Sequence, residues 1–132
     1  MKPAEEVRRE LVTQWLARAD DFALAEHLVL EEAPFPAAIA FHAQQAAEKY
    51  LKAFLVAHQT EFPKTHDLGR LLDLVAAIDK VLADSLADTV PLTDYGVDVR
   101  YPGDLPEIRI EEAKRAVQLA AAARSALRER LP

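Results

Sequence analysis

Residues 41–72, FHAQQAAEKYLKAFLVAHQTEFPKTHDLGRLL, decide the fold. Apolar residues recur there every three or four positions, as in a helix with one buried face, and we expect that helix over residues 36–58. Its buried stripe is predicted to be Ala40, Ala43, Ala47, Tyr50, Leu51 and Phe54. Phe62-Pro63-Lys64 then predicts an extended link, because the residue before a proline avoids helical geometry. Thr65 or Asp67 is placed to cap a further helix.

Helical patterns also fill the chain on both sides of this stretch. Residues 4–32 carry one apolar stripe and predict a long first helix, in which a bend is expected, if anywhere, at Asp20-Asp21. Residues 79–89 predict a helix or a turn, and Pro91 is placed to open a short helix. A last helix is expected from about residue 105 to the C-terminus. We therefore predict an all-α fold, an up-and-down bundle of about five helices.

Composition and charge narrow the function classes. A chain of 132 residues can bury a core, and we expect a single domain over residues 1–132. The absence of cysteine excludes disulfides and thiolate metal sites. A net charge of −6 disfavours bulk electrostatic binding of nucleic acid, which would need a local basic patch. No apolar run approaches the roughly 20 residues of a membrane span. No signal-peptide pattern is seen either, so we expect a cytoplasmic protein without membrane contact.

Common catalytic and metal-binding motifs are absent from the sequence. It contains no glycine-rich phosphate loop, no HExxH or ExxH pair and no nucleophile elbow. Asp94, Asp98 and Asp104 could gather around a divalent cation, but exposed acids on helices are far commoner. We therefore predict no metal and no cofactor.

One stripe of the helix predicted over residues 36–58 is polar. It consists of His42, Gln45, Lys49 and Lys52. Such a stripe is usually a solvated face. The alternative is a surface that faces phosphate, because two ammonium groups attract an anion while histidine and glutamine donate hydrogen bonds.

His66 stands between Thr65 and Asp67 at an expected helix start. The tripeptide is typical of a cap, but a helix start also offers free N–H groups to an anion, so His66 is a further candidate for ligand contact. His27 and His58 have no partner at ligand spacing and are expected to serve packing or the surface.

Arg100-Tyr101-Pro102-Gly103-Asp104 is the most specific local signal. In one interpretation Arg100 clamps a phosphate and Tyr101 stacks on a base. In the other, Arg100 pairs with Asp104, Tyr101 fills the core and Pro-Gly makes a turn.

Three short motifs, in this order and spacing, carry a resemblance. They are Gln45-Ala46-Ala47-Glu48-Lys49 with Lys52, then Thr65-His66-Asp67-Leu68, then the loop that begins at Arg100. Over roughly residues 11–127 the chain resembles the HEPN domain family. The resemblance implies a five-helix bundle that commonly forms a homodimer, with a cleft near the end of the fourth helix. It also implies frequent pairing with a small nucleotidyltransferase, and nucleotide binding, which was proposed for the family.

The ribonuclease members of that family carry an arginine, four to six residues, and then a histidine. Counted from Arg100, the histidine would fall at Leu105, Pro106 or Glu107, and none of these is histidine. The tyrosine that follows the histidine in some toxin members has no counterpart either. Without an imidazole for acid–base chemistry at this place, no catalytic residue is predicted.

Three functions follow as hypotheses. The first is a non-catalytic homodimer that binds a nucleotide or an RNA phosphate and works with a nucleotidyltransferase. The second is a toxin-type ribonuclease that uses Arg100 with a histidine from elsewhere, and the third is a structural oligomerisation module. The expected ligand contacts are His42, Gln45, Lys49, Lys52, His66 and Arg100, with Tyr101 and Asp104 shaping the loop.

Overall fold

The computed structural model describes residues 3–32, 35–96 and 107–131. These residues form helices and their connections, and no β-strand occurs among them, so the predicted all-α class is confirmed. In chain order the elements are α1 (Ala4–Arg18), α2 (Asp21–Leu30), α3 (Pro36–Ala57), α4 (Leu68–Ile78), α5 (Lys80–Ser85), the 3₁₀ helix η1 (Ala87–Gly96) and α6 (Ile110–Arg128).

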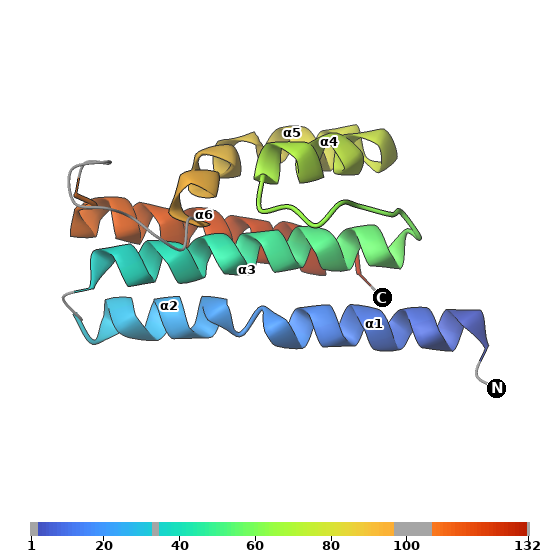
Figure 1. Ribbon diagram of the computed structural model, residues 1–132, viewed down its shortest axis with the longest axis horizontal. Helices are drawn as coiled ribbons and strands as arrows, with labels where there is room; N and C mark the ends of the chain where they lie inside the picture. The colour runs from blue at the N-terminus through green and yellow to red at the C-terminus, as the bar shows by residue number, and fades with distance from the viewer. Residues whose placement is uncertain (1–2, 33–34, 97–106, 132) are drawn as a thin grey trace.

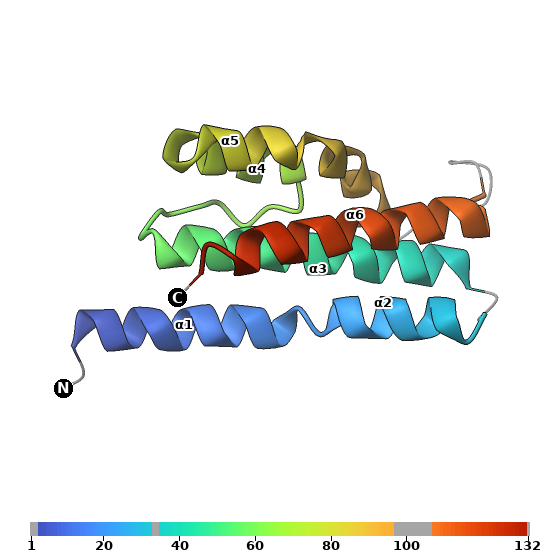
Figure 2. The same ribbon diagram turned by 180° about the vertical axis from the view of Figure 1, so that it is seen from behind.

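Helix α3 is the centre of the bundle. It contacts α1, α2, α4, η1 and α6. Helices α1 and α2 follow each other along one side of α3, α6 runs beside it, and α4 and α5 lie on the side opposite α1 and α2 (Figures 1 and 2). A helix with neighbours on several sides must be apolar over most of its surface. The predicted stripe of α3, from Ala40 to Phe54, is accordingly buried.

Alanine dominates the contact between α3 and α6. Both helices bury small side chains at no more than 1% exposure, namely Ala40, Ala43, Ala46, Ala47, Ala113, Ala116, Ala120 and Ala123. Small side chains let two helix axes approach closely, which is why this pair forms the most extensive contact in the bundle.

The first helix differs from its prediction. Instead of one helix over residues 4–32, the chain forms α1 and α2 with a break at Ala19 and Asp20, where the bend was expected. The N–H groups of Ala19, Asp20 and Phe22 each bond a carbonyl three residues back rather than four. This tight turn buries Ala19 and Phe22 and directs Asp21 toward α3. Single-stripe periodicity cannot reveal such a break.

The link and the start of α4 agree with the prediction, and Asp67 rather than Thr65 is the cap. The Asp67 carboxylate accepts hydrogen bonds from the N–H groups of Gly69 at 2.9 Å and Arg70 at 3.3 Å. Thr65 instead accepts one from the Asp67 N–H at 3.1 Å. Aspartate fits this position because its oxygen satisfies N–H groups that the first helical turn leaves unpaired.

The chain after α4 departs from the prediction at η1 and at the start of α6, whereas α5 lies in the region that was expected to be a helix or a turn. The Asp79 carboxylate caps α5 by accepting a hydrogen bond from the Leu82 N–H at 3.0 Å. This hydrogen bond is the main cause that holds the pKa of the Asp79 carboxyl below its usual value, and the hydrogen bond and charge of Arg130 lower it further. The 3₁₀ helix η1 contains Pro91 rather than starting at it, since the tighter helix begins at Ala87. Helix α6 begins at Ile110 instead of residue 105, because Arg109 is extended.

Among the described residues, no helix combines the length and the apolar character that a membrane span requires.

The end of α3 generates a prediction for stability. Gln59 has a φ of 55°, and the Thr60 N–H bonds the Leu55 carbonyl while the Gln59 N–H bonds the Val56 carbonyl. This is a Schellman ending, whose left-handed residue is usually glycine. Gln59→Gly should therefore raise the free energy of unfolding by roughly 0.5–1 kcal/mol, measured by urea titration.

The matched control is Gln14→Gly, the same replacement at an exposed position inside α1. It should lower the free energy of unfolding by about 1 kcal/mol, because glycine is a poor residue inside a helix. Shifts of the same sign at both positions would contradict the assignment of Gln59.

Candidate functional site

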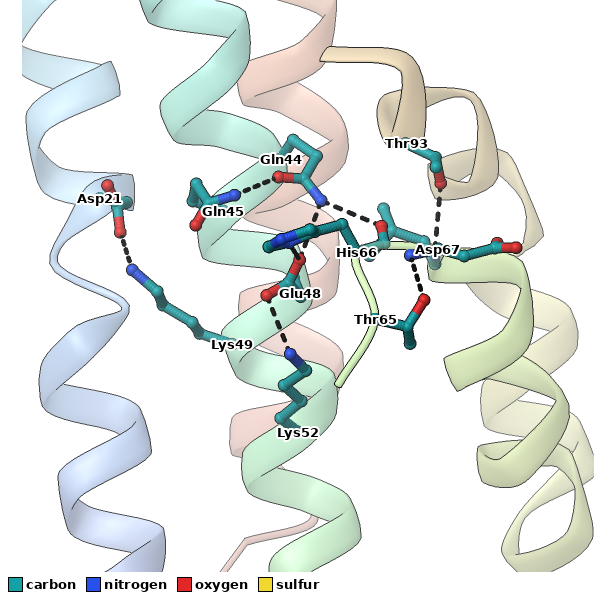
Figure 3. A network of polar contacts seen from close by, with 11 residues as sticks. Asp21, Gln44, Gln45, Glu48, Lys49, Lys52, Thr65, His66, Asp67 and Thr93 are labelled. Atoms are coloured by element: carbon teal, nitrogen blue, oxygen red, sulfur yellow. Dashed lines mark hydrogen bonds and ion pairs between the residues drawn. The ribbon is translucent and has the colours of Figure 1, made fainter. Parts of the chain in front are cut away.

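A cluster of polar side chains lies on one face of α3, between α1–α2 and the link that leads to α4. Figure 3 shows most of these side chains, which come from α2, from α3 and from the link. We call this group the α3 cluster. Its members are Asp21, His42, Gln44, Gln45, Glu48, Lys49, Lys52 and His66. It is organised by two carboxylates, each of which holds one histidine and one lysine.

Asp21 is the first of these carboxylates. One oxygen, Oδ1, lies 2.6 Å from His42 Nδ1, and the other, Oδ2, accepts a hydrogen bond from Lys49 Nζ. His42 and Lys49 are seven residues apart, so both project from the same face of α3, toward α2. Their side chains are partly buried, at 26% and 21% exposure, and that of Asp21 is at 16%. His42 and Lys49 of the predicted stripe therefore share one carboxylate.

Glu48 is the second carboxylate, and its side chain is only 5% exposed. It lies 3.0 Å from Lys52 Nζ, 2.6 Å from His66 Nδ1 and 3.2 Å from Gln44 Nε2. A buried carboxylate is costly unless it is paired and hydrogen-bonded, and these three donors supply that pairing. Because a carboxylate only accepts hydrogen bonds, His66 must carry a proton on Nδ1, and Nε2 is the ring nitrogen that remains for another contact. The His66 side chain is 63% exposed.

Gln44 joins the cluster to the link. Its side chain is fully buried, donates to Glu48 and to the His66 carbonyl at 3.2 Å, and accepts from Gln45 Nε2 at 2.7 Å. It also packs against Gly96, where an added Cβ would lie only 2.8 Å from its amide carbon. Gln44 was not among the predicted site residues, although its spacing from Ala40 and Ala47 places it within the buried stripe.

Lys52 lies in an aromatic box rather than on a solvated stripe. Its residue exposure is 7%, and Nζ lies 5.5 Å from the ring centre of Trp15 and 5.7 Å from that of Phe62. The two rings meet edge to face at 6.0 Å, and Arg18 covers Trp15 from 5.7 Å. Cation–π contact and the Glu48 ion pair together hold this ammonium group. The expectation of a solvated stripe is therefore wrong for Lys52, because α1 and the link cover it.

The α3 cluster contains two lysines and two carboxylates, so it is neutral when both histidines are neutral and carries +2 when both are protonated. Arg18 adds a further cation beside it, over the ring of Trp15. The whole chain carries −6. Protonation of the two histidines would therefore give this face a positive charge that attracts an anion.

The N–H groups at the start of α4 are not available to an anion, contrary to the expectation for this helix start. The Leu68 N–H donates to Thr93 Oγ1 at 3.0 Å, and those of Gly69 and Arg70 are taken by Asp67. Any contact from this segment to a ligand would come from the imidazole of His66.

The remaining predicted site residues are Arg100, Tyr101 and Asp104, which lie outside the described residues, as does Asp98. The phosphate clamp and the alternative Arg100–Asp104 pair stay predictions. In the part of the chain that is described, no three histidine, cysteine or acidic side chains are grouped to hold a metal ion.

Comparison with known proteins identifies the family. The model of the HEPN domain matches residues 12–130, a span that includes the whole α3 cluster and most of the chain. Comparisons with curated proteins and with solved structures gave no match. The three motifs that carry the resemblance lie within the matched span, and the all-α bundle agrees with it. The chain therefore belongs to the HEPN domain family.

Proposed function

We propose that this HEPN protein is a binding module for a nucleotide or for the phosphate groups of RNA. The observation that carries the proposal is the gathering of two lysines and two histidines on one face of α3, with Arg18 beside them, in a chain of net charge −6. Phosphate recognition combines cationic groups with hydrogen-bond donors, and the cluster supplies both.

His66 is the best-placed contact for such a ligand. Its Nδ1 is held by Glu48, and most of its side chain is exposed. When the ring is protonated, Nε2–H can donate to a phosphate oxygen. Lys52 stabilises this arrangement indirectly, because its Nζ donates a hydrogen bond to the other oxygen of Glu48.

The surroundings of the cluster suit a base as well as a phosphate. Trp15 is partly exposed, and Arg18 lies over its ring. Aromatic and guanidinium planes are the groups on which unpaired bases stack. His42, Gln45 and Lys49 continue the polar face along α3 and complete the proposed contact surface.

Binding can be followed through Trp15, because it is the one tryptophan of the chain. Titration with AMP, ATP, GTP and a short single-stranded RNA should change its fluorescence for at least one ligand and raise the melting temperature. His66→Ala should weaken that binding roughly tenfold, as expected for loss of one charge-assisted hydrogen bond.

His27→Ala is the matched control, since His27 is exposed on α2 and lies outside the cluster. It should leave affinity unchanged. If no ligand in the series changes either signal at millimolar concentration, the proposed binding function is wrong.

We further propose that the protein forms a homodimer and works in the cytoplasm with a small nucleotidyltransferase. Family membership supports this, as do the exposed Val7 and Leu11 of α1, which are apolar and 41% and 43% exposed. A tagged pull-down from native lysate should recover a nucleotidyltransferase at near-equal amounts, and light scattering of the purified chain should give twice 14.7 kDa. A monomer recovered alone would contradict both parts.

A second candidate function is a ribonuclease with a relocated histidine. The observation that favours it is the Glu48–His66 pair, in which a buried carboxylate orients an exposed imidazole. In that arrangement Nε2 could accept the proton of a ribose 2′-hydroxyl. If so, the purified protein should cleave single-stranded RNA, and His66→Ala should reduce the rate at least about 100-fold while His27→Ala does not. Equal product from wild type and His66→Ala would exclude this role for His66.

A further inference from the structure

The partners of Asp21 point to a second property of the cluster. Within the residues that the structure describes, His42 and Lys49 have their polar contacts with Asp21 alone. Each oxygen of the carboxylate meets one of them. The carboxylate therefore presents two acceptor oxygens to two donors, which is how a phosphate group would bind the same pair.

Asp21 does not serve its own helix. The N-cap of α2 is Asp20, which makes no side-chain cap, and the polar contacts of the Asp21 side chain run to α3. Asp21 directly follows the break between α1 and α2, where the hydrogen bonds span three residues. Its position thus depends on a short turn rather than on the interior of a helix.

The pair of donors is reachable from solvent. Exposure of 26% for the His42 side chain and 21% for that of Lys49 places both at the edge of the cluster, not inside the core. This contrasts with Lys52, which is enclosed by two rings and by Glu48 at 8% side-chain exposure. An incoming anion could reach His42 and Lys49 without opening the core, but it would have to displace Asp21.

We infer that His42 and Lys49 form a phosphate site that Asp21 occupies in the unliganded protein as an internal competitor. The nature of the ligand rests on the proposed function, whereas the competition rests on the contacts of Asp21. With an internal competitor, the apparent affinity equals the intrinsic affinity multiplied by the fraction of molecules in which the site is free. Removing the carboxylate should therefore strengthen phosphate binding, although it removes an ion pair from the fold.

The test compares Asp21→Asn with Asp20→Asn. Both changes remove one negative charge from the start of α2, but Asp20 is exposed and has no side-chain partner among the described residues. Thermal unfolding is measured at pH 7 in sodium phosphate and in sodium chloride of equal ionic strength. General stabilisation by phosphate acts on every variant alike, so only a difference between the variants reports the site.

We expect Asp21→Asn to melt below Asp20→Asn in chloride and to gain more from phosphate than Asp20→Asn or the wild type. Its affinity for inorganic phosphate should rise at least about fivefold, the lower end of common coupling strengths. The double variant Asp21→Asn/Lys49→Gln should lose that gain. If Asp21→Asn is unfolded in chloride, its refolding in phosphate supports the inference when the double variant Asp21→Asn/Lys49→Gln stays unfolded there; refolding of both variants or of neither overturns it. Equal phosphate effects in both single variants also overturn it.

Nucleotide titrations separate this inference from the proposed function. If nucleotides bind the wild type, Asp20→Asn and Asp21→Asn with equal affinity, the function stands and the internal competitor does not. If Asp21→Asn gains phosphate affinity while no variant binds a nucleotide or RNA, the competitor stands and the proposed function falls.

Discussion

The arrangement of this bundle depends on the burial of one carboxylate, that of Glu48. A carboxylate at 5% exposure needs donors for both oxygens, and it takes them from three places: Lys52 one turn along α3, Gln44 one turn back, and His66 on the link. Those donors are then fixed in turn, Lys52 by the aromatic rings of α1 and the link. Satisfying one buried charge thus connects three segments that are distant in sequence.

Features set by local sequence patterns could be predicted from the sequence, and features set by contacts between distant segments could not. Helix α3, the extended link and the Asp67 cap follow from local patterns of spacing and side-chain chemistry, and all three were found as expected. The pairing of Lys49 with Asp21 spans 28 residues and depends on how two helices meet, which no local pattern encodes. The stripe of α3 was predicted to be either a solvated face or a surface that faces phosphate, and the enclosure of Lys52 by the rings of α1 and the link depends on tertiary contacts in the same way. The loop that begins at Arg100 lies outside the described residues, so its role stays a prediction.

Global charge and local charge carry different information in this protein. The net charge of −6 disfavours a surface that holds nucleic acid by bulk attraction, yet one face of α3 gathers two lysines and two histidines around two carboxylates. The net charge of a chain therefore does not report where its cations gather on the folded surface.

The alanine-rich contact between α3 and α6 has a consequence for how the chain folds during synthesis. Helix α6 follows the other described helices in the chain, and it covers the side of α3 where Ala43, Ala46 and Ala47 are fully buried. Until residues 110–128 have left the ribosome, that side of the central helix lacks its α6 partner, and the contacts that close the bundle are long-range ones. The core therefore closes only after α6 has been made, rather than being built progressively as the earlier helices appear.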